Sequence, residues 1–121
     1  MPAKHPLVRQ RDATPQADWP FGEMQRIVIG DGGVANVSVA KLKSLPPFYH
    51  TGYDEIYYVL SGTGTVTLNG EPSRLQPGSV VVIPAGVSHA LQADSGCELE
   101  FVIFGSPPIP IDDDRAKPRR L

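Results

Sequence analysis

The sequence predicts an all-β domain, either a sandwich or a barrel. Between Met24 and Phe104, short apolar segments are separated by turn residues at intervals of roughly ten, which is the spacing expected of such folds. No segment has a sustained helical period, so any helix is expected to be a single turn. The 121 residues include 12 glycines and 13 prolines, and this length and composition fit one domain that is rich in turns.

The expected strands are short, and each ends at a chemically specific break. Asn69-Gly70 predicts a tight hairpin, because a type I′ turn needs positive φ at both central positions. Pro46-Pro47 and Pro84-Ala85-Gly86 are interpreted as further breaks. The strands are expected over residues 25–29, 34–42, 56–60, 64–68, 79–83, 88–93 and 98–104. The last of them carries apolar residues on both faces, so the pattern leaves its inward face open.

Both ends of the chain are expected to lie outside the barrel, which takes residues 23–105. Residues 1–22 are predicted to form an irregular N-terminal arm, because they hold charges and prolines without any period. Trp19 in this arm either anchors it on the core or lines a pocket. Residues 106–121 are predicted to form an extended tail, since proline recurs in them and supplies no amide donor.

Composition argues against nucleic acid and membrane partners. The formal net charge of −2 offers no excess positive potential to a phosphate backbone or an anionic lipid surface. The longest aliphatic run, residues 80–83, is far shorter than the roughly 20 residues of a membrane span, and the N-terminus lacks the apolar stretch of a signal peptide. The single cysteine, Cys97, cannot form an internal disulfide. A cytoplasmic protein is therefore expected.

Two segments combine turn glycines with side chains that can bind a metal. In the first, His50 and Glu55 flank a short turn that contains Gly52, so the end of one strand and the start of the next can aim both side chains into one barrel. In the second, the apolar segment 79–83 runs into a Pro-x-Gly turn, and the returning strand begins with His89.

These segments resemble the paired motifs of the cupin superfamily, which are approximately G-x5-HxH-x(3,4)-E-x6-G and G-x5-PxG-x2-H-x3-N. His50 falls on the second histidine of the first motif, followed at the expected spacing by Glu55 and Gly62. The second motif is matched at Gly78, Pro84, Gly86 and His89. The resemblance covers about residues 34–104 and implies a single antiparallel jelly-roll barrel with its functional site inside. Small cupins commonly pair, so it also implies a homodimer.

The chain departs from the family pattern at two positions. Phe48 stands where the first histidine is expected, and Ala93 stands where asparagine is expected. The implied ligand set is therefore His50, Glu55 and His89, and two imidazoles with one carboxylate suit one divalent transition metal, whether Fe, Ni, Mn, Co or Zn. The alternative is a metal-free hydrogen-bond network of the same three side chains.

Further residues are expected to act beside these ligands. Side chains alternate along a strand, so Tyr57 shares the inward face of Glu55, where its phenol either serves as a general acid and substrate contact or fills the barrel. Phe48 is expected to form an apolar wall for the substrate, and Leu91, which shares the face of His89, to be a further substrate contact. Glu55 is a second candidate for acid-base catalysis if it does not bind the metal.

Two classes of function follow from these residues. The first is a metal-dependent cupin enzyme that acts on a small oxygen-rich substrate in a biosynthetic tailoring pathway, as an oxygenase or as a Lewis-acid isomerase, dehydratase or decarboxylase. The second is a metal-free cupin cyclase or dehydratase, or a module that binds a sugar or an organic acid without turnover. No DNA-binding segment is recognised in the sequence, which favours the enzyme. The expected partners are a small-molecule substrate and a second copy of the chain.

Overall fold

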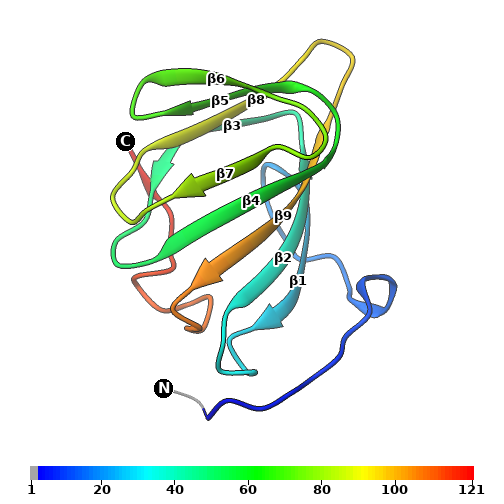
Figure 1. The fold of residues 1–121 in the computed structure, drawn as a ribbon, viewed down its shortest axis with the longest axis vertical. Coiled ribbons are helices and arrows are strands. Elements are labelled where there is room, and N and C mark those ends of the chain that lie inside the picture. The colour runs from blue at the N-terminus through cyan, green and yellow to red at the C-terminus, as the bar shows by residue number, and fades with distance from the viewer. Residues whose placement is uncertain (1–2) are drawn as a thin grey trace.

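The computed structural model describes residues 3–121 and confirms the all-β jelly-roll fold (Figure 1). Two five-stranded antiparallel sheets face each other. The first sheet has the order β1 (Gly22–Ile29), β2 (Asn36–Leu42), β9 (Leu99–Ser106), β4 (Asp54–Ser61) and β7 (Val80–Ile83). The second has the order β10 (Arg119–Arg120), β3 (Ser44–Tyr49), β8 (His89–Ala93), β5 (Gly64–Leu68) and β6 (Glu71–Leu75). A single 3-10 turn, Arg11–Ala13, precedes them.

The structure contains three strands, β3, β6 and β10, that the sequence did not predict. Pro46-Pro47 lies within β3 rather than ending a strand. The pairing of β3 with β8 shifts register at these prolines, so no hydrogen bond between the strands requires a backbone N–H from them. β6 contains Pro72 and forms the edge of its sheet, where a missing amide is tolerated. β10 has only two residues and depends on β3 for its pairing. Proline therefore marks strand edges and irregularities in this fold.

The hairpin prediction is confirmed. Asn69 and Gly70 have φ of 48° and 84°, as a type I′ turn requires, and Leu68 pairs with Glu71 across them. Asn69 has a second role, since its side-chain Oδ1 accepts a hydrogen bond of 2.9 Å from the backbone amide of Ser88. The turn thus helps to place the start of β8, which carries His89.

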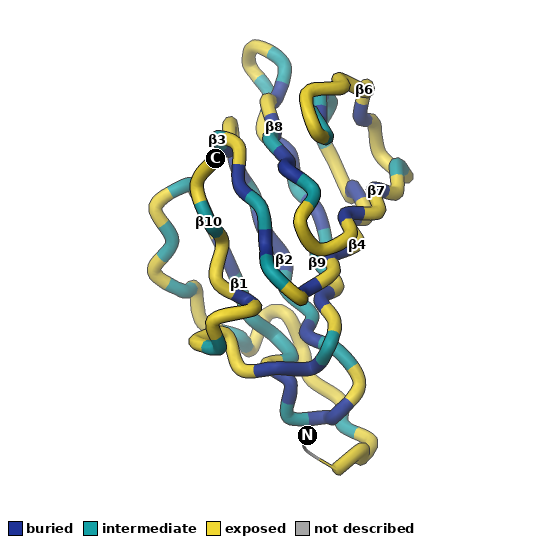
Figure 2. The backbone as a smooth tube through the Cα atoms, turned by 90° about the vertical axis from the view of Figure 1, so that its left-hand side faces the viewer, coloured by how far each residue is buried: buried dark blue, intermediate teal, exposed yellow. Residues whose placement is uncertain are grey.

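The core lies between the two sheets, and buried positions alternate with exposed ones along the strands (Figure 2). The structure settles the inward face of β9, on which Leu99 and Phe101 are buried. Glu100 points the other way and accepts a hydrogen bond of 2.7 Å from Arg11 of the arm. Within the described residues, no helix is long and apolar enough to cross a membrane.

The arm and the tail both contact the barrel. Ala17 of the arm donates a backbone hydrogen bond of 2.7 Å to Met24 of β1, and Trp19 packs against the core. Residues 1–2 of the predicted arm lie outside the described residues. The tail leaves β9, passes over one end of the barrel and returns to β3 as β10 (Figure 1). The division of the chain after residues 22 and 105 stays a prediction, although β1 already begins at Gly22.

Candidate metal centre

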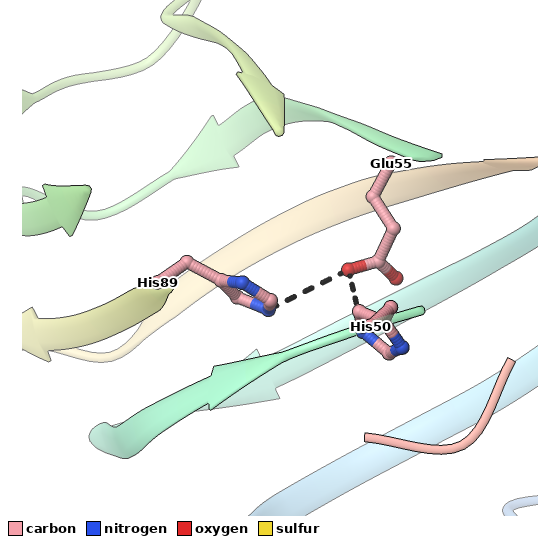
Figure 3. A group of neighbouring side chains, drawn as sticks. All are labelled: His50, Glu55 and His89. Carbon is pink, nitrogen blue, oxygen red and sulfur yellow. Dashed lines mark ion pairs between the residues drawn. The ribbon is translucent and has the colours of Figure 1, made fainter. Parts of the chain in front are cut away.

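The side chains of His50, Glu55 and His89 point toward one another (Figure 3). His50 directly follows β3, Glu55 is the second residue of β4, and His89 is the first residue of β8. Only 8%, 8% and 2% of their respective surfaces are exposed. One ligand atom from each lies within 4.8 Å of the others. The sequence-predicted ligand set is therefore brought together in the folded chain.

Hydrogen bonds between the two motif segments fix this convergence. The amide of Gly86, in the Pro-x-Gly turn, donates to the carbonyl of His50 at 2.7 Å. The amide of Ala85 donates to the carboxylate of Asp54 at 2.7 Å, next to Glu55. The two motifs thus work as one unit, because the turn of the second holds the loop of the first.

Backbone carbonyls determine which nitrogen of each imidazole carries its proton. Nδ1 of His50 lies 3.1 Å from the carbonyl of Ala116, and Nδ1 of His89 lies 3.2 Å from the carbonyl of Val87. A carbonyl oxygen only accepts, so Nδ1 is the donor in both rings. In the neutral rings Nε2 then keeps its lone pair. These two Nε2 atoms lie 3.1 Å and 3.6 Å from the same oxygen, Oε1 of Glu55 (Figure 3).

Burial and charge shift the two histidines in opposite directions. Burial lowers the pKa of His50, but the hydrogen bond and charge of Glu55, helped by the carbonyls of Ala116 and Lys117, outweigh it, so the pKa is raised. Burial also lowers the pKa of His89, where the charge of Glu55 offsets only part of the effect and His50 adds to it. His89 therefore keeps a free Nε2 lone pair more readily than His50.

The donor chemistry of this cluster fits a divalent transition metal. Two Nε2 lone pairs and a carboxylate oxygen face one another, and a cation is the partner that satisfies all three. Imidazoles held by carbonyls through the opposite nitrogen are also the arrangement by which proteins orient metal ligands. The cluster could thus hold a metal, and the donor types do not choose among Fe, Ni, Mn, Co and Zn.

A cavity of about 120 Å³ lies beside the cluster and is lined by all three of its residues. Aromatic rings form one wall. Phe48 packs edge-on against Phe21 with ring centroids 5.4 Å apart, and Phe21 packs likewise against Trp19 at 5.6 Å. Trp19 thus both packs against the core and lines the cavity. One water molecule needs about 10–15 Å³ of such a cavity, so the cavity can hold several waters or a small molecule.

The predicted substrate contacts do not all reach the cavity. Phe48 and Tyr57 line it. The hydroxyl of Tyr57 lies 3.5 Å from Oε1 of Glu55, and burial, followed by the charge of Glu55, raises its pKa well above the ordinary value, so the phenol stays protonated. Leu91 is instead buried in the core and does not line the cavity. In the structure, Leu91 packs in the hydrophobic core.

Two residues of the site carried no assignment in the sequence analysis, Tyr53 and Asn36. The Nδ2 group of Asn36 donates to the hydroxyl of Tyr53 at 3.1 Å and to the carbonyl of Ile109 at 2.8 Å. Burial raises the pKa of Tyr53 to about 12. Tyr53 lies between His50 and Glu55 in the sequence, and this position is the signal that could have pointed to it. Asn36 lies outside both motifs and has no such signal.

The match to known proteins agrees with this geometry. Residues 36–105, which include the whole cluster, match the family described as the cupin domain. This chain belongs to the cupin family. The recognition of the cupin pattern from the sequence is confirmed by this match and by the solved cupin structures of the same fold.

Three proteins illustrate the range of similarity. An uncharacterized protein from Streptomyces coelicolor is 40% identical over 55 residues, which are 46% of this cupin and 51% of that protein, so the chain spans about half of its length. L-ectoine synthase from Mycobacteroides abscessus is 30% identical over 90 residues, covering 70% and 68% of the two chains. A solved protein from Planctomyces limnophilus superposes with a TM-score of 0.79 at 26% identity over 90% of this chain and 95% of that one.

Proposed function

We propose that this cupin is a metal-dependent enzyme that acts on a small oxygen-rich substrate, as an oxygenase or as a Lewis-acid isomerase, dehydratase or decarboxylase. One observation carries the proposal: two imidazoles, each fixed through Nδ1 by a backbone carbonyl, turn their Nε2 atoms toward one carboxylate oxygen beside a cavity. The similarity to a protein named L-ectoine synthase supports an enzymatic role.

The residues of the cavity have distinct parts in this proposal. His50, Glu55 and His89 hold the metal, which when bound supplies Lewis acidity or redox chemistry. Phe48 stands at a ligand position but cannot coordinate, so it leaves that side open to substrate and shields it from bulk water. Tyr57, which stays protonated, donates a hydrogen bond or a proton to a substrate oxygen.

Elemental analysis tests the metal site directly. The protein purified from metal-supplemented medium is expected to hold about one transition metal per chain, because the donor set makes one site. His50→Ala and His89→Ala are expected to lose it. His5→Ala is the matched control, since His5 is exposed in the arm, and it is expected to keep the metal. Absence of Fe, Ni, Mn, Co and Zn from the wild type would contradict the proposal.

Turnover assays then separate the two kinds of chemistry. Uptake of oxygen with phenols, diketones or hydroxy acids would identify an oxygenase, whereas conversion of a substrate without oxygen uptake would identify Lewis-acid catalysis. A ligand that binds and is recovered unchanged with every metal would instead indicate a binding module.

The metal-free network is the second candidate, and the short contact between His50 and Glu55 favours it. Their Nε2 and Oε1 atoms are 3.1 Å apart, and the pKa of His50 is raised, so an imidazolium that donates to the carboxylate satisfies both groups. The barrel would then serve as a metal-free cyclase or dehydratase, or would hold a sugar or organic acid. Turnover by protein that elemental analysis shows to be metal-free would select this candidate.

The homodimer and the cytoplasmic location belong to the proposal as expectations. Apolar side chains on the outer faces of β4, β7 and β9 support a second copy as partner, because a large exposed apolar surface is a common mark of an interface. The members of this surface are Ile56, Tyr58, Leu60, Val80, Val82 and Phe104. Sedimentation equilibrium is expected to give twice the chain mass, and Val82→Lys is expected to shift it toward the monomer. A monomeric wild type would contradict the expectation.

A further inference from the structure

We propose that the cavity binds a substrate carboxylate at Arg26, so that the substrate is an acid whose carboxylate lies at the end remote from the metal-binding cluster. The inference deepens the proposed function and rests on it for the chemistry at the cluster. It names a residue outside both sequence motifs, and it narrows the oxygen-rich substrate to an anionic one.

The fold places Arg26 on the inner face of β1. Met24 is buried in the core and pairs with Ala40 of β2, so the side chain two residues further along β1 points to the same face. Arg26 pairs with Ser38 in the same register, and both residues line the cavity. A guanidinium and a hydroxyl therefore lie side by side at one end of the cavity.

Arg26 differs from most other arginines of the chain in the contacts that its guanidinium makes. Among the described residues, its guanidinium makes neither an ion pair nor a hydrogen bond. The partnered arginines and their carboxylates are Arg9 with Asp31, Arg11 with Glu100, Arg74 with Asp94, Arg115 with Asp113 and Arg119 with Asp114. Arg26 is half-buried rather than exposed and lines the cavity, so a ligand in the cavity can supply the acceptor that its guanidinium lacks.

The charges of the cavity point to an anion at this end. Among the described residues that line it, Arg26 and Glu55 are the only charged ones apart from the histidines, and Glu55 belongs to the cluster. A carboxylate is the group that pairs with a guanidinium through two parallel hydrogen bonds, and Ser38 adds a neutral donor beside it. This end of the cavity is thus positive, and no carboxylate of residues 3–121 neutralises it.

The spacing between the two ends sets the shape of the substrate. Arg26, Ser38, Ile103 and Tyr57 form one row across the first sheet, on adjacent strands β1, β2, β9 and β4. Three strand spacings separate the first and last Cα atoms, about 14 Å. Ile103 and Phe21 also line the cavity, so its middle is apolar. The substrate that fits has an oxygen end at the cluster, an apolar middle and a carboxylate at Arg26.

Two probes that differ only at the remote end test the site, 3,4-dihydroxyphenylacetate and 3,4-dihydroxyphenylacetamide. Their catechol oxygens suit the cluster, and only the first carries a carboxylate. Binding is measured by calorimetry to metal-free protein and to protein incubated with Zn²⁺, which is not redox-active. The wild type is expected to bind the acid at least about tenfold more tightly than the amide, as a charge-assisted hydrogen bond implies.

Variants assign this preference to Arg26. Arg26→Gln is expected to bind both probes equally. Arg26→Lys keeps the positive charge but cannot donate two parallel hydrogen bonds to a carboxylate, so it is expected to retain part of the preference for the acid. Arg74→Gln removes the same charge at the β5–β6 hairpin outside the cavity and is expected to retain all of it. A preference that persists in Arg26→Gln, equal binding of both probes to the wild type, or no binding of the acid overturns the proposal.

The two proposals fail separately in this experiment. If Zn²⁺ binds at the cluster and the wild type shows no preference for the acid, the carboxylate site is wrong and the metal site stands. If Zn²⁺ does not bind but the preference depends on Arg26, the carboxylate site stands and the metal-dependent chemistry is wrong.

Discussion

The two faces of β4 differ in an unusual way: the inner face carries a buried carboxylate, and the outer face carries exposed apolar side chains. On the inner face, Glu55 is as buried as the core residues around it, and Tyr57 follows it inward. On the outer face, Ile56, Tyr58 and Leu60 are exposed. The strand has regular alternation, but its inner face begins with a carboxylate and its outer face is largely apolar.

Alternation along β4 thus fixes the direction of a side chain and not its environment. A buried carboxylate is retained only where another group satisfies it. Here Nε2 of His50 and Nε2 of His89 lie 3.1 Å and 3.6 Å from Oε1 of Glu55, so a bound cation or a protonated His50 would supply that partner. Exposed apolar residues carry no such cost singly, and in a group they mark a surface for a partner. The inner face is therefore expected to be sensitive to small chemical changes, and the outer face tolerant of them.

Glu55→Gln is expected to give the largest effect. The variant keeps the shape of the side chain and removes its charge, so metal affinity is expected to fall at least about a hundredfold. Elemental analysis and metal titration measure this loss. Glu100→Gln makes the same change on the outer face of the same sheet and is expected to keep the metal. Equal metal content in both variants would remove the distinction between the faces.

Removal of the metal is expected to destabilise the wild type and to leave Glu55→Gln unchanged. A ligand present at 100 times its dissociation constant adds about 2.7 kcal/mol to the free energy of unfolding, so chelation is expected to lower Tm by several degrees.

The affinity for the metal is expected to rise as pH increases through the raised pKa of His50, because a proton and the metal compete for Nε2. An unchanged Tm on chelation, or affinity that falls with increasing pH, contradicts this prediction.

Gly105→Ala tests how tightly the inner face is packed. Gly105 pairs with Asn36 and Glu55 on the neighbouring strands, and a β-carbon there would overlap the hydroxyl and ring of Tyr53. The expected cost is about 1–3 kcal/mol in the free energy of unfolding, measured by denaturant. Tyr53→Ala makes room for the new methyl group. The cost of Gly105→Ala is expected to be smaller in that background, and an equal cost would show that the overlap is not its cause.

Phe48→His restores the first histidine of the cupin pattern. It tests whether the side of the metal next to Phe48 is open to the substrate. The new imidazole is expected to tighten metal binding about tenfold while lowering turnover, because it occupies the place proposed for the substrate. Tyr57→Phe is expected to lower turnover and leave metal binding unchanged, since its hydroxyl contacts Glu55 only at 3.5 Å. Unchanged turnover in both variants would remove these two roles and leave the metal site intact.

The adjacent residues Val81 and Val82 on β7 give the smallest effect and the closest matched pair. Val81 is 6% exposed and Val82 is 60% exposed. Val81→Thr buries a hydroxyl and is expected to cost about 1–3 kcal/mol, whereas Val82→Thr is expected to change the free energy of unfolding by less than about 0.5 kcal/mol. Both are measured at a concentration at which the chain sediments as a monomer. Equal costs would show that alternation on β7 does not separate the two environments.

The sequence by itself predicted the fold and the three side chains that meet in the candidate site, because the strand pattern and the resemblance to the cupin motifs both rest on local spacing. Period-two alternation, the turn at Asn69-Gly70 and the two glycine-bounded motifs each act within about fifteen residues. The strands that it missed, β3 and β6, contain prolines whose missing amides are harmless only at an irregularity or an edge. Those positions exist only once the strands have paired.

Only the tertiary structure determined the tautomers, the burial and the charge balance of the candidate site. The proton on Nδ1 of His50 is fixed by the carbonyl of Ala116, 66 residues away, and a backbone carbonyl has no signature in the sequence. Leu91 has the parity of a cavity residue but is covered by the core, because parity gives a direction and not a distance. The unpaired guanidinium of Arg26 likewise depends on which carboxylates the fold has placed elsewhere. A local pattern describes neighbours along the chain, whereas burial, tautomer and charge balance depend on neighbours in space.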